Sequence, residues 1–343
     1  MQKLKQGTPV RDEEREELDF LGGIYCPAKE RFGAAFHDFE AAYNEGKSGT
    51  DRVRIAVPSE HRNNEKYHNI VSIRQKEKFP AIVTAAGFLE FFRTDFISQA
   101  ESGCLRGWFA SLDLPPSPHP LFQGLQLDDP KKIFTLYGAM PYVLVVNHRR
   151  LNGRAAPRRI DDLIKSEYSG SVAVPYAPDD ITEHLLLSIW RKSGADGIQA
   201  LARNVLPALT GHAPELISDM IANKDGGACV YLMTWFFANS APKRDYIEVV
   251  WPEDGALLCP LYAVAKADLT APQKAAADFL LGAELGQKLS EGWFAHINPD
   301  VRYKLDRESK PHFQWEGWDY IYEKPLEERV AEIERMFKQA GSC

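Results

Sequence analysis

The stretch from Tyr137 to Tyr176 constrains the fold more than any other part of the chain. Residues 137–147 form an apolar run rich in β-branched side chains, as expected of a strand buried on both faces. A basic link leads to residues 157–165, where an initial proline and an apolar side predict a short helix. Residues 169–176 then predict a new strand. This order predicts the passage of the chain from one α/β lobe into a second.

Length and composition agree with two lobes and exclude several classes of protein. The chain has 343 residues, which exceeds the roughly 250–300 residues that one hydrophobic core usually supports. The formal charge of −7 argues against nonspecific binding to nucleic acid. No apolar run reaches the roughly 18 residues that a membrane span requires. We therefore expect no nucleic-acid partner and no direct insertion into a membrane.

Two amphipathic patterns predict helices near the ends of the chain. Phe32, Phe36, Phe39 and Tyr43 recur at spacings of four, three and four, which places four aromatic side chains on one helical face. Leu326, Val330, Ile333 and Phe337 repeat the same spacing near the C-terminus. We interpret both faces as core, so the C-terminal helix is expected to pack on its own body.

Two motifs resemble a known family. Tyr137-Gly138 and the strand that ends at Asn147 precede Pro157, Asp162-Leu163 and Tyr168-Ser-Gly170. This pattern resembles the crossover of the type II periplasmic-binding-protein fold, and specifically the ferric-iron-transporter solute-binding family. Residues 249–256 resemble the return strand of that family and its Pro-Glu-Asp-Gly turn. The resemblance covers residues 135 to 300 well and the first 130 residues weakly.

The resemblance implies an α/β fold with two lobes and a central cleft. The first lobe would contain both chain ends, residues 1–147 and 253–343, and the second would be inserted as residues 148–252. The implied function is that of a solute-binding protein of an ATP-binding-cassette (ABC) transporter. Such a protein binds a small polar or anionic ligand by hinge closure and presents it to an ABC permease, with no enzymatic step and no cofactor.

Two alternatives stay open. Residues 1–17 lack the apolar core of a secretory signal, and the five cysteines contain no Cys-x-x-Cys pair. These features favour a cytoplasmic sensor or carrier derived from the same fold; a periplasmic protein whose signal has been removed is the alternative location. The third hypothesis is an enzyme that uses Cys26 as nucleophile and His61 as base, against which a small buried thiol is the simpler interpretation.

Candidate ligand-binding residues lie where strands end and helices begin, because ligands of doubly wound sheets bind beyond the carboxyl ends of the strands. Asp179 or Asp180 is also expected to cap the helix that follows. Tyr137 and Trp235 would stack on a ligand, with core packing as the equal alternative. The predicted set is Cys26, Pro27, Ser59, Glu60, His61, Ala86, Gly87, Tyr137, Asp180, Thr182, Thr234 and Trp235.

No metal site is predicted. Ferric-binding members of the family usually present two adjacent tyrosines in the second lobe, whereas this sequence has Tyr231 followed by Thr234-Trp235. Glu253 and Asp254 look like a catalytic acid pair, but a tight turn near the hinge explains their spacing better. The basic residues 148–150 are interpreted as a solvated turn.

Overall fold

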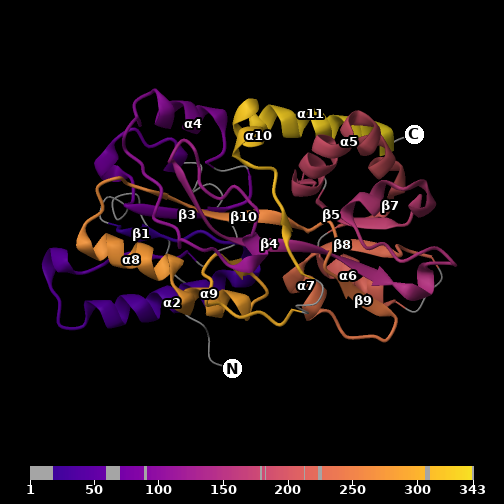
Figure 1. The fold of residues 1–343 in the computed structure, drawn as a ribbon, viewed down its shortest axis with the longest axis horizontal. Coiled ribbons are helices and arrows are strands. Elements are labelled where there is room, and N and C mark those ends of the chain that lie inside the picture. Colours follow the sequence, from indigo (N-terminus) through magenta and orange to yellow (C-terminus); the bar gives the residue numbers. More distant parts are fainter. Residues whose placement is uncertain are drawn as a thin grey trace. The chain divides into compact units, whose positions relative to one another are not determined.

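The chain forms two compact units in the computed structural model (Figure 1). Unit 1 comprises Met1–Ala139 and Pro260–Tyr303, and unit 2 comprises Met140–Cys259 and Lys304–Cys343. The chain therefore passes between the units three times. The structure describes residues 18–58, 70–88, 91–177, 180–181, 183–211, 213–222, 226–305 and 310–341.

The strands of unit 1 are mostly short and lie in the order β2, β1, β3, β10. β1 is parallel to β2 and to β3, and β10 is antiparallel to β3. The pairing of β1 with β3 brings their carboxyl ends to the same edge of the sheet. The bounds are β1 Phe20–Leu21, β2 Ile55–Ala56, β3 Ile82–Ala86, β10 Ala256–Ala265 and β11 Ala295–His296.

Aromatic packing holds the first long helix of unit 1. α2 (Cys26–Asn44) buries Phe32 and Phe36 as predicted, and the Phe36 ring stacks on Phe20 of β1 at 4.1 Å between centroids. Phe39 is only half-buried, yet its ring stacks on Phe279 of α8 at 4.5 Å. In Figure 1, α8 (Ala271–Leu281) and α9 (Ala283–Ser290) lie on the same side of the strands as α2, and α4 (Thr94–Glu101) lies on the other.

The apolar run that opened the sequence analysis forms β4 (Phe134–Asn147). All of its fourteen residues are buried, which confirms the prediction of a strand covered on both faces. The chain passes from unit 1 to unit 2 within β4, after Ala139, and returns within β10, after Cys259. Both of these passages therefore lie inside strands.

Unit 2 combines parallel and antiparallel pairing. β8 is antiparallel to β4 and parallel to β5, β7 is parallel to β5, and β9 is antiparallel to β4. β12 pairs in parallel with the start of β10. The bounds are β5 Val172–Ala177, β6 Asp180–Ile181, β7 Val205–Gly211, β8 Val230–Thr234, β9 Ile247–Val250 and β12 Phe313–Gln314.

The structure refines one local prediction in unit 2 and corrects another. The predicted short helix is present as a 3-10 helix, η5 (Ile160–Ile164). Asp180 lies in β6 instead of capping a helix, because α5 begins at Glu183 and runs to Asn204 with a kink at Gly194. α5 gives way directly to β7 at Val205, and β7 pairs in parallel with β5.

The C-terminal helix packs on unit 2, although the sequence assigned it to the first lobe. α11 (Leu326–Gly341) buries its four predicted apolar side chains and lies against α5. Arg329 of α11 stands over the Tyr320 ring at 3.9 Å, in α10 (Trp318–Glu323). Amphipathic spacing shows that a helix has an apolar face, but it does not show which surface receives that face.

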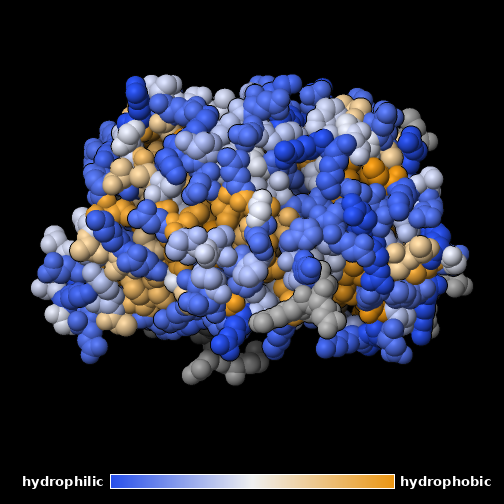
Figure 2. Space-filling view, viewed as in Figure 1, coloured by the Kyte–Doolittle hydropathy of each residue, from blue (hydrophilic) through white to orange (hydrophobic). Residues whose placement is uncertain are grey.

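Hydrophilic side chains dominate the face of the molecule in Figure 2, with hydrophobic residues visible between them. Among the described residues, the large hydrophobic side chain that stands out is Val249, which is 38% exposed. No helix within the described part of the chain is both long enough and apolar enough to cross a membrane.

A buried histidine ties β11 to α8 in unit 1. His296 is fully buried, its Nε2 donates to the Leu280 carbonyl at 2.9 Å, and its Nδ1 accepts from the Asn298 amide at 3.1 Å. This pattern fits only the neutral ring. Burial lowers the pKa of His296 to about 4, with a smaller contribution from His119.

We expect acid to destabilise unit 1 through His296. Its folded pKa lies below the unfolded value of about 6.5, so its contribution to stability is present above pH 6.5 and is lost as pH falls towards 4. Between pH 7.5 and pH 5 the wild type should lose about 2 kcal/mol of unfolding free energy more than His296→Gln. Urea unfolding of both proteins at the two pH values measures this difference, and equal losses would contradict the prediction.

Candidate functional site

Two of the predicted strand ends meet at one edge of unit 1. The backbone amide of Gly23 donates to both the carbonyl and the hydroxyl of Thr84, which aligns the segment after β1 with β3. The Tyr25 hydroxyl lies where a Cβ on residue 87 would stand, and Gly87 has a φ of +84°. Cys26-Pro27, which come after β1, and Ala86-Gly87, at the end of β3, therefore lie at the same edge.

The start of α2 gives this edge a partial positive charge. α2 begins at Cys26 with Pro27 in its first turn, no acidic residue lies in that turn, and Tyr25 provides no side-chain cap. The first amides of a 19-residue helix carry the positive end of its dipole. Cys26 is exposed and Pro27 is half-buried there, so the edge is suited to an anionic group.

Several other predicted residues lie outside the described part of the chain. Ser59, Glu60, His61 and Thr182 belong to this group, so the pairing of Cys26 with His61 is not examined by the structure. Asp180 is described only by its backbone in β6. The contribution of these residues to a site stays a prediction. Within the described ranges, no three His, Cys, Asp or Glu side chains converge to hold a metal ion.

Tyr137 lies inside unit 1. Its ring is fully buried in β4, and the centroid of the His296 ring lies 6.2 Å away at a tilt of 55°. Of the two interpretations offered for Tyr137, core packing describes this environment.

Thr234 and Trp235 lie where β8 ends and α7 (Trp235–Ser240) begins in unit 2. The Thr234 hydroxyl accepts from the Phe237 amide at 3.4 Å and so caps the helix. Trp235 is buried, and its ring meets Trp251 edge-on at 5.3 Å. Trp251, which the sequence did not single out, is fixed in turn by a bond from its Nε1 to the His312 carbonyl at 2.8 Å.

A buried charged network lies behind β8, and the sequence analysis missed it. Arg150 was expected in a solvated turn, but its side chain is only 7% exposed. Its Nη1 donates to Asp219 Oδ2 at 2.9 Å and to the Tyr231 hydroxyl at 2.7 Å. The Tyr231 hydroxyl donates to the same Asp219 oxygen at 2.5 Å. The sequence gives no sign that Arg150 is buried, because its partners Asp219 and Tyr231 lie 69 and 81 residues away.

This network makes Tyr231 a structural residue. Burial raises the pKa of Tyr231, and the hydrogen bond to Asp219 raises it further. A phenol in this state does not readily become the tyrosinate that would bind a ferric ion. Tyr231 is the tyrosine that the sequence analysis compared with the family's tyrosine pair, and its hydroxyl is already bonded inside unit 2.

We expect Gly87→Ala to destabilise unit 1 more than Gly107→Ala. Both glycines have positive φ, but a Cβ at Gly107 meets nothing within 4 Å, whereas at Gly87 it would displace the Tyr25 hydroxyl. Gly107→Ala should cost about 1 kcal/mol of unfolding free energy for its backbone strain alone. Chemical denaturation measures both costs, and a Gly87→Ala cost no larger than that of the control would contradict the packing of Tyr25 over Gly87.

Tyr231→Phe should lower the unfolding free energy by about 1.5–3 kcal/mol, because it removes a buried hydroxyl bonded to two charged groups. The matched control is Tyr246→Phe, which removes one hydroxyl bond of 3.3 Å to the Ile221 carbonyl near the surface. The control should cost less than about 1 kcal/mol. Equal costs in denaturant titrations would show that the buried network adds no stability beyond an ordinary hydrogen bond.

The fold of this chain is similar to that of solved proteins with different bound solutes. It is similar to the Trichodesmium protein IdiA (FutA) in complex with iron and citrate, with a TM-score of 0.62, 10% identity, and coverage of 94% of this chain and 98% of that one. It is also similar to AfuA from Actinobacillus pleuropneumoniae with bound fructose-6-phosphate, with a TM-score of 0.57, 15% identity, and coverage of 93% and 96%.

A third similar structure is the spermidine/putrescine ABC transporter substrate-binding protein PotD from Streptococcus pneumoniae, in complex with calcium and HEPES. Its TM-score is 0.58 at 15% identity, with coverage of 94% of this chain and 98% of that one. A comparison with curated proteins finds no match. At these identities the similarity establishes the fold, which is the predicted two-lobed α/β fold of periplasmic binding proteins.

The family follows from the sequence model that matches residues 77–324, which is well over half of the chain. This model describes bacterial extracellular solute-binding proteins. The match confirms the prediction of a solute-binding protein, and the chain belongs to this bacterial extracellular solute-binding family.

Proposed function

We propose that the chain binds a small anionic or polar solute by closing its two lobes over it, and that it delivers this solute to an ABC permease. The observation that carries the anionic preference is the start of α2. There Cys26-Pro27 and Ala86-Gly87 share one edge of unit 1, with a helix dipole that no acidic first-turn residue offsets. Binding occurs without chemical conversion of the solute.

Closure is compatible with the way the chain connects the units. Three passages join them, and two of these lie inside the strands β4 and β10. Because only a small number of passages join them, the two units are able to move about a hinge. Solute binding then shifts the population towards the closed form by as much as the solute prefers that form.

Iron is not the solute that we propose. The sequence contains no adjacent tyrosines, and the Tyr231 hydroxyl is bonded to Arg150 and Asp219 inside unit 2. Of the similar structures, one holds iron and citrate, one holds fructose-6-phosphate, and one is the substrate-binding protein of a spermidine/putrescine transporter. One fold therefore accommodates solutes of opposite charge, and the choice depends on the side chains at the site.

The description of the family favours a protein that works outside the cytoplasm. This location agrees with the periplasmic alternative rather than with the cytoplasmic expectation. The proposed partner is accordingly a permease that faces the same compartment.

A panel of thermal unfolding measurements tests the proposal with inorganic phosphate, citrate, fructose 6-phosphate, spermidine and ferric citrate. A bound solute at a hundred times its dissociation constant should stabilise the protein by about 2.7 kcal/mol. We expect stabilisation by at least one anion and none by spermidine. Ferric citrate should act no more strongly than citrate and should produce no tyrosinate charge-transfer colour.

The control uses the two glycine variants. Gly87→Ala should weaken binding of the stabilising anion, and Gly107→Ala should leave it unchanged, because only the first variant disturbs the edge at α2. Stabilisation by spermidine alone, or a coloured ferric complex, would overturn the anionic assignment.

A further inference from the structure

The Pro-Glu-Asp-Gly turn joins β9 to β10 in unit 2. The Gly255 amide donates to the Pro252 carbonyl at 2.9 Å, and Gly255 has a φ of +98°, so residues 252–255 form the predicted tight turn. The two acidic side chains of the turn differ in exposure: Glu253 is exposed, whereas the Asp254 side chain is turned inward and only 6% exposed. Its burial requires partners that compensate the charge.

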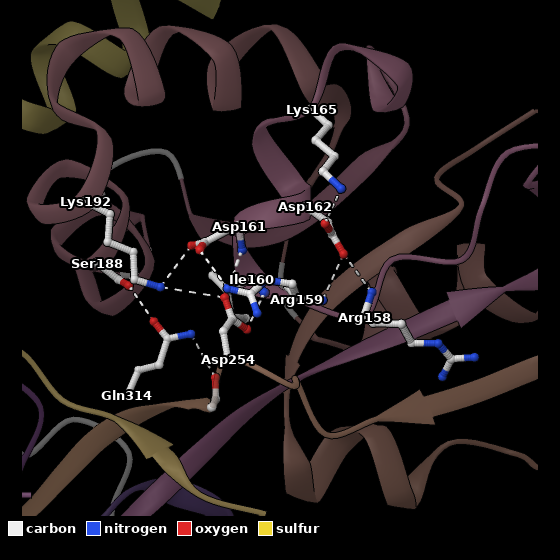
Figure 3. A network of polar contacts seen from close by, with 11 residues as sticks. Arg158, Arg159, Ile160, Asp161, Asp162, Lys165, Ser188, Lys192, Asp254 and Gln314 are labelled. Carbon is white, nitrogen blue, oxygen red and sulfur yellow. Dashed lines mark hydrogen bonds and ion pairs between the residues drawn. The ribbon is translucent and has the colours of Figure 1, made fainter. Parts of the chain in front are cut away.

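The partners of Asp254 come from two distant segments (Figure 3). One carboxylate oxygen accepts from the Ile160 amide at 2.9 Å and the other accepts from the Asp161 amide at 3.2 Å, at the start of η5. Lys192 of α5 places its Nζ 3.6 Å from Asp254 and 2.9 Å from the Asp161 carboxylate. Asp254 therefore satisfies helix-start amides that lie 94 and 93 residues away.

A third segment is bound to the same turn. Gln314 of β12 donates its side-chain amide to the Gly255 carbonyl at 3.0 Å, and its Oε1 accepts from the Ser188 hydroxyl of α5 at 3.2 Å. The Ala256 amide donates to the His312 carbonyl at 3.0 Å. A Cβ on Gly255 would lie 2.8 Å from the backbone nitrogen of Gln314, so only glycine lets the turn and β12 come this close.

These three segments have a special place in the chain. β10 begins directly after the turn and carries the chain back to unit 1, and the chain enters unit 2 for the last time at Lys304, before β12. Asp254 therefore lies just before one of the three passages, and Gln314 lies on the unit 2 side of another. η5 and α5 are the elements of unit 2 that hold them.

We propose that Asp254 and Lys192 form a lock that joins the unit 2 ends of these two passages into one cooperative body with η5 and α5. The body opens as a whole when the Asp254 carboxylate is lost. The consequence for solute binding rests on the proposed function. If the lobes close over a solute, the body around Asp254 moves as one rigid piece, and the chain bends within the strands that pass between the units. The joining itself requires no solute.

Hydrogen exchange of the solute-free, full-length protein, followed by mass spectrometry, tests the lock. In Asp254→Ala we expect peptides that cover residues 158–164, 253–258 and 311–316 to exchange at least tenfold faster together. Asp254→Asn keeps an oxygen acceptor at this position but loses the negative charge that faces Lys192. Its increase in exchange rate should therefore be smaller and should occur in the same three segments. Lys192→Met should likewise raise exchange in all three.

The matched control is Lys338→Met, which breaks an exposed lysine–glutamate pair with Glu334 in the same unit. It should leave the three segments unchanged. An increase confined to residues 158–164 would reduce Asp254 to a local cap and overturn the lock, as would unchanged exchange in all variants. If Asp254→Ala does not fold, Asp254→Asn and Lys192→Met still decide the outcome, and neither depends on whether the solute panel succeeds.

Discussion

Burial of β4 is the constraint on which both units depend. All fourteen residues from Phe134 to Asn147 are buried, and unit 1 receives the first part of the strand while unit 2 receives the rest. A strand of this kind needs cover on both faces and partners on both edges along its length. In unit 2 those partners are β8 and β9, and in unit 1 β11 pairs with it. A single hydrophobic segment thus contributes to the core of both units and links them covalently.

Unit 2 then has to accommodate buried polar groups around this apolar framework. Arg150, Asp219 and Tyr231 compensate one another behind β8, and Asp254 is compensated by two backbone amides and Lys192. An arginine or aspartate without such partners would cost several kcal/mol when buried. In both networks the partners come from segments far apart in sequence. Buried charges therefore act as specific connections between elements, in addition to the non-directional hydrophobic core.

The fold narrows the function without choosing the solute. Proteins with the same architecture include one bound to iron and citrate, one bound to a sugar phosphate, and the substrate-binding protein of a polyamine transporter. The framework supplies strand ends and helix starts, whereas the charge and shape of a site come from the side chains placed there. In this chain the start of α2 and the internal use of Tyr231 are the features on which the proposal of an anionic solute rather than iron rests.

Periodicity and local chemistry determined much of the structure in advance. The apolar run at β4, the aromatic face of α2 and the apolar face of α11 were predictable because each pattern is set by neighbours along the chain. The turn at residues 252–255 was predictable from its glycine and acidic residues. The same local reasoning brought Cys26 and Gly87 into the candidate set, and the structure places both at one edge of unit 1.

Tertiary structure alone decided which surfaces those elements meet. The spacing of α11 did not reveal that it packs on α5, and nothing in residues 148–150 indicated that Arg150 is buried while its neighbours are exposed. Asp180 was expected to cap a helix but lies in β6, because Ala177 of β5 pairs with it. The physical reason is the same for α11 and Arg150: a residue's own sequence sets its local preference, but its burial and partners depend on contacts with residues tens of positions away.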